Sequence, residues 1–217
     1  MEHIYNPSIF HVSSYEEARE IILTSATDAS TDERWQIETP FLVERILNHL
    51  QPNENTLIVD YGCGIGRLAK ELIARSGCWV IGVDISPSMR ILSQSYVVSD
   101  RFMICSPISF QSMIERGLKI DHAYAVWVLQ HLPIPELDTR LIKHSLRNNG
   151  KFYVVNAHTR YVPADLGWID DGKSIQQILE QHFQTLDEDR FPEGKIFNWV
   201  HTHAFLKLYQ KKDGNTL

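Results

Sequence analysis

Three glycines at alternating positions, Gly62, Gly64 and Gly66, directly follow a short apolar run within residues 57–67. Glycine lets the backbone turn sharply and come close to a ligand, because no side chain occupies the space. A helical pattern follows, and the first N–H groups of a helix carry partial positive charge that suits a carboxylate. Asp60, at the end of the apolar run, can accept a hydrogen bond from an ammonium group. The turn is therefore predicted to hold the charged groups of an amino-acid moiety.

A second acid, Asp84, ends the next apolar run, residues 79–84, twenty positions after Gly64. A carboxylate at the end of a neighbouring strand is placed to accept hydrogen bonds from both hydroxyls of a ribose. The glycine spacing distinguishes between ribose-containing ligands. A dinucleotide site reads GxGxxG, whereas this turn reads GxGxG and has Arg67 where the third glycine would stand. Binding of a pyrophosphate is therefore disfavoured.

The glycine turn belongs to a regular alternation of short apolar runs and helical patterns. Five candidate parallel strands lie at residues 56–60, 79–84, 102–105, 123–127 and 151–156. Helices are expected at residues 67–75, 86–95, 135–146 and 174–182, and two further strands at residues 185–189 and 199–209. In the last strand His201 and His203 would share one face. The alternation predicts an α/β fold in which helices cover both faces of a parallel sheet.

These residues resemble the class I, Rossmann-like S-adenosylmethionine (SAM)-dependent methyltransferases. The first motif of that family looks like residues 59–66 here, and its second motif ends in an acid such as Asp84. Residues 120–133, which end in Leu-Gln-His-Leu-Pro, and residues 146–156 are similar to the family's fourth and fifth strands. The resemblance implies a doubly wound, mostly parallel seven-stranded sheet that binds SAM as its cofactor.

The resemblance also implies which residues hold the cofactor. In that family, the residues that match Asp60, Gly62 and Gly64 surround the methionine part of SAM. The residue that matches Asp84 binds the ribose hydroxyls, and the residue that matches Ile85 lies against the adenine. The methionine end and the adenosine end of the cofactor are therefore expected on neighbouring strands.

One position departs from the family pattern. Many relatives have an aspartate after the third strand, where it receives the adenine amino group, whereas this chain has Ser106. Ser106 is expected either to replace that acceptor or to belong to a plain Ser-Pro turn. Met89 either packs on the adenine or belongs to the core. The remaining residues expected at the cofactor are Cys63, Gly66, Val126, Trp127 and Gln130.

Methyl transfer from a sulfonium is an in-line displacement, so the protein mainly has to align the acceptor and exclude water. A base helps where an oxygen or nitrogen acceptor must lose a proton, and histidine suits that task near neutral pH. His131 follows the fourth strand, although the matching histidine of relatives often has a structural role. Asn156, at the end of the fifth strand, either contacts the substrate or caps the loop that follows. His131 and Asn156 are the catalytic candidates.

Residues 157–173 are predicted to form a long loop over the same edge of the sheet. His158 and Tyr161 in this loop, together with Trp35 upstream, are candidates for the acceptor pocket. Packing of the aromatic rings within the loop is the alternative. Acceptor recognition is thus expected outside the glycine turn.

Residues 1–50 are predicted to form an N-terminal helical lid, and residues 51–217 the SAM-binding domain. Helices are expected at residues 16–23 and 40–50, the second with Thr39 as its N-cap and Pro40 in its first turn. Tyr5, Phe10 and Tyr15 make the N-terminus aromatic. It is expected to fold over the site or to contact a second subunit in a homodimer.

The composition is that of a globular protein, with 43% hydrophobic and 22% charged residues. The net charge of −6 argues against a nucleic-acid partner, because neutralising phosphates requires a basic face. No apolar stretch approaches the roughly 20 residues of a membrane span. The three cysteines lack metal-ligand spacing, so no metal is expected. We expect a cytoplasmic protein without a membrane partner.

The preferred hypothesis is a SAM-dependent methyltransferase that acts on a small molecule, such as a natural-product, sugar or other metabolite intermediate. Three alternatives stay open. The same fold can use SAM without methylation, by cyclising or cleaving it to methylthioadenosine. The chain could instead be a non-catalytic SAM-binding subunit. RNA methylation is the weaker alternative, because the sequence has neither an Asn-Pro-Pro-Tyr-type motif nor a basic run.

Overall fold

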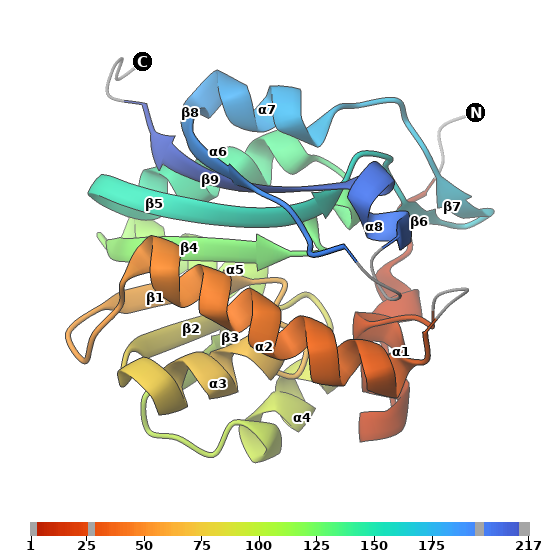
Figure 1. Ribbon diagram of the computed structural model, residues 1–217, viewed down its shortest axis with the longest axis horizontal. Coiled ribbons are helices and arrows are strands. Elements are labelled where there is room, and N and C mark those ends of the chain that lie inside the picture. Colours follow the sequence, from red (N-terminus) through yellow and green to blue (C-terminus); the bar gives the residue numbers. More distant parts are fainter. Residues whose placement is uncertain (1–3, 26–28, 194–197, 213–217) are drawn as a thin grey trace.

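A seven-stranded sheet forms the centre of the computed structural model, which describes residues 4–25, 29–193 and 198–212 (Figure 1). The strand order is β3-β2-β1-β4-β5-β9-β8. All neighbours pair in parallel except β9, which is antiparallel to both β5 and β8. The strands are β1 (Leu57–Tyr61), β2 (Trp79–Val83), β3 (Phe102–Cys105), β4 (Ile120–Val126), β5 (Leu146–Ala157), β8 (Phe183–Asp189) and β9 (Ala204–Lys211). The predicted α/β fold with a mostly parallel sheet is confirmed.

Helices cover both faces of the sheet (Figure 1). One layer consists of α2 (Thr31–Leu50), α3 (Arg67–Ser76) and α4 (Pro87–Tyr96), and the other of α5 (Pro107–Glu115), α6 (Pro135–Ser145) and α7 (Ile175–His182). Each layer encloses its own hydrophobic core. Tyr153 belongs to the first core and its neighbour Phe152 to the second, because successive strand residues face opposite sides. Burial on both faces explains why the inner strands β1 and β2 are apolar runs, whereas the edge strand β8 is largely exposed and polar.

The N-terminal region lies across the edge of the sheet where the parallel strands end. It contains η1 (Pro7–Phe10) and α1 (Tyr15–Ile22), and α1 packs beside the glycine turn in a cluster that includes Ala18, Ile65 and Met89. The predicted loop at residues 157–173 contains a hairpin of β6 (Val162–Ala164) and β7 (Gly167–Ile169). The backbone N–H of Asn6 donates to the Pro163 carbonyl at 3.0 Å. The N-terminus and the hairpin therefore cover this edge together.

Helix α2 begins nine residues earlier than the predicted start at Pro40, so the predicted helix start at Thr39 and Pro40 is wrong. Ser30 is the N-cap, and its hydroxyl accepts from the Glu33 N–H while the Glu33 carboxylate accepts from Ser30. This reciprocal capping box satisfies two N–H groups that a helix start leaves unpaired. Pro40 lies inside the helix. The capping signal outweighs the proline, and Thr39 is free to contact Arg67.

The predicted last strand, residues 199–209, is wrong in its first half. Residues Asn198–His203 form the helix α8, and β9 begins only at Ala204. In a helix, residues two positions apart point in different directions, so His201 and His203 do not share a face. A second difference is α5, because the sequence pattern indicated a Ser-Pro turn as one reading of this segment and the structure has a helix. Ser106 is the N-cap of that helix and Pro107 its first residue.

Candidate active site

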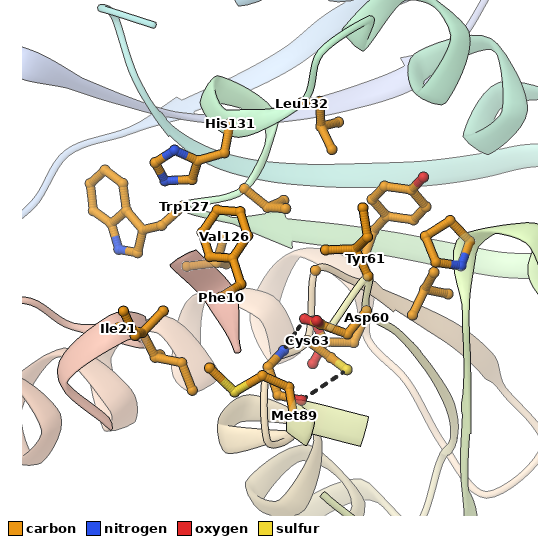
Figure 2. Close-up of a pocket in the computed structure, with 18 of the residues that line it drawn as sticks. Phe10, Ile21, Asp60, Tyr61, Cys63, Met89, Val126, Trp127, His131 and Leu132 are labelled. Atoms are coloured by element: carbon orange, nitrogen blue, oxygen red, sulfur yellow. Dashed lines mark hydrogen bonds between the residues drawn. The ribbon is translucent and has the colours of Figure 1, made fainter. Parts of the chain in front are cut away.

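A pocket lies where β1, β2 and β4 end at the same edge of the sheet (Figure 2). The glycine turn forms part of its wall. Side chains of the N-terminal region, Tyr5, Phe10, Ile21 and Ile22, close it from the other side. Figure 2 shows His131 and Trp127 toward one end of the pocket and Tyr61 toward the other. The pocket thus lies between the ends of the strands and a largely apolar cover.

The glycine turn fits its surroundings only without side chains. Gly62 and Gly64 both have positive φ, at 76° and 54°. A Cβ atom on Gly62 would lie 2.2 Å from Cγ2 of Val128, and one on Gly64 would lie 2.7 Å from Cδ1 of Ile22. Real Cβ atoms essentially never come that close to another atom. The turn therefore forms a cradle of backbone without side chains, packed closely against Val128 and Ile22.

Asp84 fastens this cradle to the end of β2. Its Oδ2 accepts from the N–H of Gly64 at 2.8 Å, and its Oδ1 accepts from the N–H of Ser86 at 2.8 Å. Burial raises the pKa of Asp84, while these two backbone donors favour the ionised form. A carboxylate offers about four acceptor positions. Both oxygens can therefore accept further hydrogen bonds from ribose hydroxyls.

Asp60 is a buried carboxylate on the pocket wall, only 4% exposed. Burial raises its pKa to about 7, the negative charge of Asp84 acts in the same direction, and the Tyr124 hydroxyl and the charge of Arg67 oppose the shift. A cation in the pocket would restore the ordinary ionised state. The ammonium group of SAM supplies such a cation, so the acid and the cradle together fit the amino-acid end of this cofactor.

Trp127, directly after β4, has φ of 60°, a conformation that bulky residues rarely adopt. Two hydrogen bonds hold it there. Its backbone N–H donates to the Val155 carbonyl at 2.8 Å, and its indole Nε1–H donates to Oε1 of Glu38 at 2.7 Å. Glu38 is fully buried and also pairs with Arg34 at 2.8 Å and Arg67 at 3.7 Å. The middle of α2 is therefore fixed to two strand ends of the pocket.

His131 ends the short helix η2 (Leu129–His131) and lines the pocket. Its Nδ1 lies 2.7 Å from the Tyr161 carbonyl, and its Nε2 lies 3.2 Å from the amide nitrogen of Gln130. A carbonyl only accepts, so Nδ1 carries the proton and Nε2 is the acceptor of the neutral ring. Burial lowers the pKa of His131, which keeps the ring neutral near pH 7. The ring can therefore take up a proton at Nε2.

The site was compared with known proteins by family and by structure. Residues 59–154 match the family described as a methyltransferase domain. This match supports the resemblance to class I SAM-dependent methyltransferases, and with it the expected enzyme class and SAM as the expected cofactor.

Known proteins similar to this chain include one with a named activity and one known by its structure. A tRNA U34 carboxymethyltransferase of Mannheimia succiniciproducens is 29% identical over 202 residues, which is 80% of this chain and 60% of that enzyme. A Pyrococcus horikoshii OT3 protein of known structure superimposes with a TM-score of 0.65 at 16% identity, over 92% of this chain and 100% of that chain. The chain therefore spans about 60% of the length of that curated relative.

A further solved structure contains bound molecules. The geranyl diphosphate C-methyltransferase of Streptomyces coelicolor A3(2), in complex with Mg²⁺, geranyl diphosphate and S-adenosyl-L-homocysteine, superimposes with a TM-score of 0.62 at 11% identity. The superposition covers 98% of this chain and 92% of that chain. At such low identity, the structural likeness shows the fold of this chain and nothing of its substrate.

The structure brings most of the predicted cofactor residues of the methyltransferase together. Nine of them line the pocket: Asp60, Gly62, Cys63, Gly64, Asp84, Ile85, Met89, Val126 and Trp127. Gly66, Ser106 and Gln130 do not. Gly66 is the N-cap of α3, and the Ser106 hydroxyl accepts from the Ser109 N–H at 3.1 Å as the N-cap of α5. The predicted adenine acceptor is therefore already engaged in capping a helix.

The second catalytic candidate, Asn156, is fully buried and lies off the pocket wall. Its Oδ1 accepts from the Gln130 N–H at 3.1 Å, and its Nδ2 donates to the Ala157 carbonyl at 2.8 Å. These bonds hold the backbone of η2 against the end of β5. The structure therefore places Asn156 behind His131, where it supports the element that carries the histidine.

The predicted acceptor residues Trp35, His158 and Tyr161 do not line the pocket either. The Trp35 ring packs against the guanidinium of Arg67, 5.4 Å from its centroid. His158 is exposed, with its ring 5.7 Å from that of Phe205. Tyr161 reaches the site through its backbone carbonyl alone. None of these three side chains therefore lines the pocket.

Several pocket residues escaped the sequence analysis. Tyr61 and Asp138 both line the pocket, and the tyrosine hydroxyl donates to Oδ1 of the aspartate. Arg67 was read only as the residue that breaks the dinucleotide pattern. The aromatic N-terminus did signal a cover, and the structure places Tyr5 and Phe10 on the pocket wall. Contacts between residues far apart in sequence gave no such signal.

Metal ligands, cysteines and membrane-spanning helices are the remaining features that bear on function. Within the described ranges, no group of three or more His, Cys, Asp or Glu side chains is placed to hold a metal ion. The three cysteines are free thiols. No helix in this part of the chain is both long and apolar enough to cross a membrane.

Proposed function

We propose that this SAM-dependent methyltransferase transfers a methyl group to a small molecule that has a largely apolar body and reacts through a hydroxyl or amine. The observation that carries this proposal is His131 at the end of an apolar pocket, a neutral imidazole whose unprotonated Nε2, 3.2 Å from the Gln130 side-chain amide, is the atom that can take up a proton. The pocket is covered by Phe10, Ile21 and Ile22, which suit a compact apolar ligand. A metabolite fits this description.

The residues of the pocket divide the work of methyl transfer. When bound, SAM supplies an activated methyl group. The methyl group is transferred by in-line attack at its carbon, and S-adenosylhomocysteine is the leaving group. Asp84 binds the ribose, and Asp60 with the glycine turn binds the amino-acid end. His131 accepts the proton of the acceptor at Nε2. Phe10 and Ile21 exclude water, which would otherwise compete with the acceptor. Residues 1–50 form the cap on the cofactor domain, residues 51–217.

A second candidate function is modification of a tRNA, which the name of the Mannheimia succiniciproducens relative favours. Two observations weigh against it. The net charge is −6, and phosphate neutralisation requires a basic face. Among the residues that line the pocket, Arg67 is the one Lys or Arg side chain, and it is paired with the buried Glu38. The small-molecule acceptor is therefore the preferred proposal.

The test is incubation of the purified protein with SAM labelled on the methyl group, in parallel with a metabolite extract and with total tRNA. Mass spectrometry then follows the label in both pools and identifies the cofactor-derived product. We expect label in a small molecule, S-adenosylhomocysteine as the co-product, and loss of both with Asp84→Ala.

The alternatives give different results. Label in tRNA would replace the small-molecule proposal by the second candidate. Methylthioadenosine without labelled acceptor would indicate cleavage or cyclisation of SAM. Tight SAM binding without any product in either pool would indicate a non-catalytic SAM-binding subunit.

A further inference from the structure

The adenine end of the pocket lacks the acceptor that the sequence leads one to expect after β3. The Ser106 hydroxyl caps α5, and the Cys105 carbonyl already accepts from the Asp84 N–H at 3.1 Å. Adenine carries an exocyclic amine, and burying it without an acceptor would cost binding energy. Another group in the pocket must take that role if the adenosine lies beside Asp84.

Asp138 is a carboxylate on this side of the pocket. It lies in the first turn of α6, and it lines the pocket together with Pro107, the first residue of α5, and with Leu132 and Pro133. Its Oδ1 accepts from the Tyr61 hydroxyl. A carboxylate offers about four acceptor positions, so this bond orients the group and leaves it able to accept again. The surrounding side chains are apolar and flat enough to contact a purine.

Tyr5 relates this acid to the ribose site. Its ring lines the pocket, and the negative charges of both Asp138 and Asp84 act on its hydroxyl. Both carboxylates therefore lie within electrostatic reach of one phenol ring. An adenosine extends from ribose hydroxyls at one end to an exocyclic amine at the other. Two carboxylates thus lie near Tyr5: Asp84 is suited to the ribose hydroxyls, and Asp138 is suited to the exocyclic amine.

We propose that Asp138, oriented by Tyr61, accepts a hydrogen bond from the exocyclic amine of the cofactor's adenine, in place of an acid after β3. Asp138 is then a specificity-determining residue for adenine, and the Tyr5 ring packs beside the purine. This inference rests on the proposed function, because it assumes that the adenosine of SAM occupies this pocket.

The test compares two nucleosides by calorimetry and needs no turnover. S-adenosylhomocysteine carries the amine, whereas S-inosylhomocysteine has a carbonyl oxygen there, which would face the carboxylate. The wild type is expected to prefer the adenosine compound by roughly tenfold or more, the range for a hydrogen bond to a charged group. Asp138→Asn offers a donor to the carbonyl instead. The preference should therefore fall at least tenfold in this variant.

A matched control comes from the same helix turn. Glu136→Gln also removes one negative charge from the start of α6, but Glu136 pairs with Lys173 at 2.8 Å and does not line the pocket. This variant should keep the wild-type preference. A preference that falls equally in both variants would indicate a general charge effect and would overturn the assignment.

The remaining outcomes are also decisive. An unchanged preference in folded Asp138→Asn, checked by thermal unfolding, refutes the role of Asp138 and leaves the proposed function intact. If the wild type binds neither nucleoside, both fail together. Should Asp138→Asn not fold, Tyr61→Phe keeps the acid but releases its orientation. That variant is expected to lose part of the preference, and full retention counts against the proposal.

Discussion

The buried guanidinium of Arg160 holds the element that carries His131, and its removal gives a sharp test of the structure. Arg160 is 0% exposed. Its Nη1 donates to the Leu129 carbonyl at 2.9 Å and its Nη2 to the Leu132 carbonyl at 2.6 Å, at the two ends of η2. Nε and Nη2 also donate to Asp171 at 3.0 and 3.1 Å. Arg160→Met keeps the apolar stem and removes every one of these donors.

The expected magnitude follows from what is left behind. Two carbonyl oxygens lose a partner in a buried place, and each such loss costs about 1–3 kcal/mol. The side chain of Asp171 is 30% exposed, so water can replace the guanidinium there. We therefore expect Arg160→Met to lower the free energy of unfolding by about 2–5 kcal/mol.

Denaturant unfolding of the wild type and two variants measures this loss. The control is Arg75→Met, which breaks a pair with Glu44 whose side chains are 45% and 52% exposed. A surface pair of this kind is worth less than about 1 kcal/mol. Losses of equal size in the two variants would refute the reasoning. So would a small loss in Arg160→Met with an unchanged denaturant slope.

Three further predictions concern the pocket itself. Gly64→Ala should weaken S-adenosylhomocysteine binding at least tenfold in calorimetry, because its Cβ would meet Ile22, whereas Gly117→Ala, with open space around its Cβ, should leave binding unchanged. The pKa of Asp60 is about 7 in the folded chain and about 3.9 in an unfolded one. The folded state therefore holds more protons between these values, and the free energy of unfolding should fall as pH rises from about 4 to about 7. Asp60→Asn should remove this fall in urea titrations, and a parallel pH dependence in both proteins would contradict the burial effect. His131→Gln should lower the methyl-transfer rate by about 10²–10⁴ while the affinity for S-adenosylhomocysteine stays within a few fold; an unchanged rate assigns His131 a structural role.

The glycine turn and its two acids could be predicted from the sequence because each signal is local. Gly62, Gly64 and Asp60 lie within one strand and its turn, and Asp84 ends the next strand of a regular alternation. Parallel strands bring their carboxyl ends to one edge of the sheet, so order along the chain becomes proximity in space. The fold and the cofactor followed from the same pattern.

Other features depend on contacts that no local pattern encodes. Trp127 donates to Glu38 across 89 positions of sequence, and Tyr61 donates to Asp138 across 77. Such pairs form because helices dock on the sheet at particular angles. The error at residues 199–203 has another cause, since a short alternating run is ambiguous between strand and helix. The start of α2 was legible in the capping box at Ser30, but the proline signal was given more weight.

The contacts divide the N-terminal region into two parts with different energetics. Glu38, in the middle of α2, is fully buried and bound by Trp127 and two arginines, so moving α2 away would separate buried charges at a cost of several kcal/mol. Phe10 and Ile21, from η1 and α1, reach the pocket through apolar contact only. Opening the pocket there would expose hydrocarbon surface and break hydrogen bonds such as the one from the Val12 N–H to the Ser88 hydroxyl at 2.9 Å, but it would separate no buried charges. Helix α2 is therefore a fixed wall of the site, and we expect a ligand to enter past η1 and α1 instead.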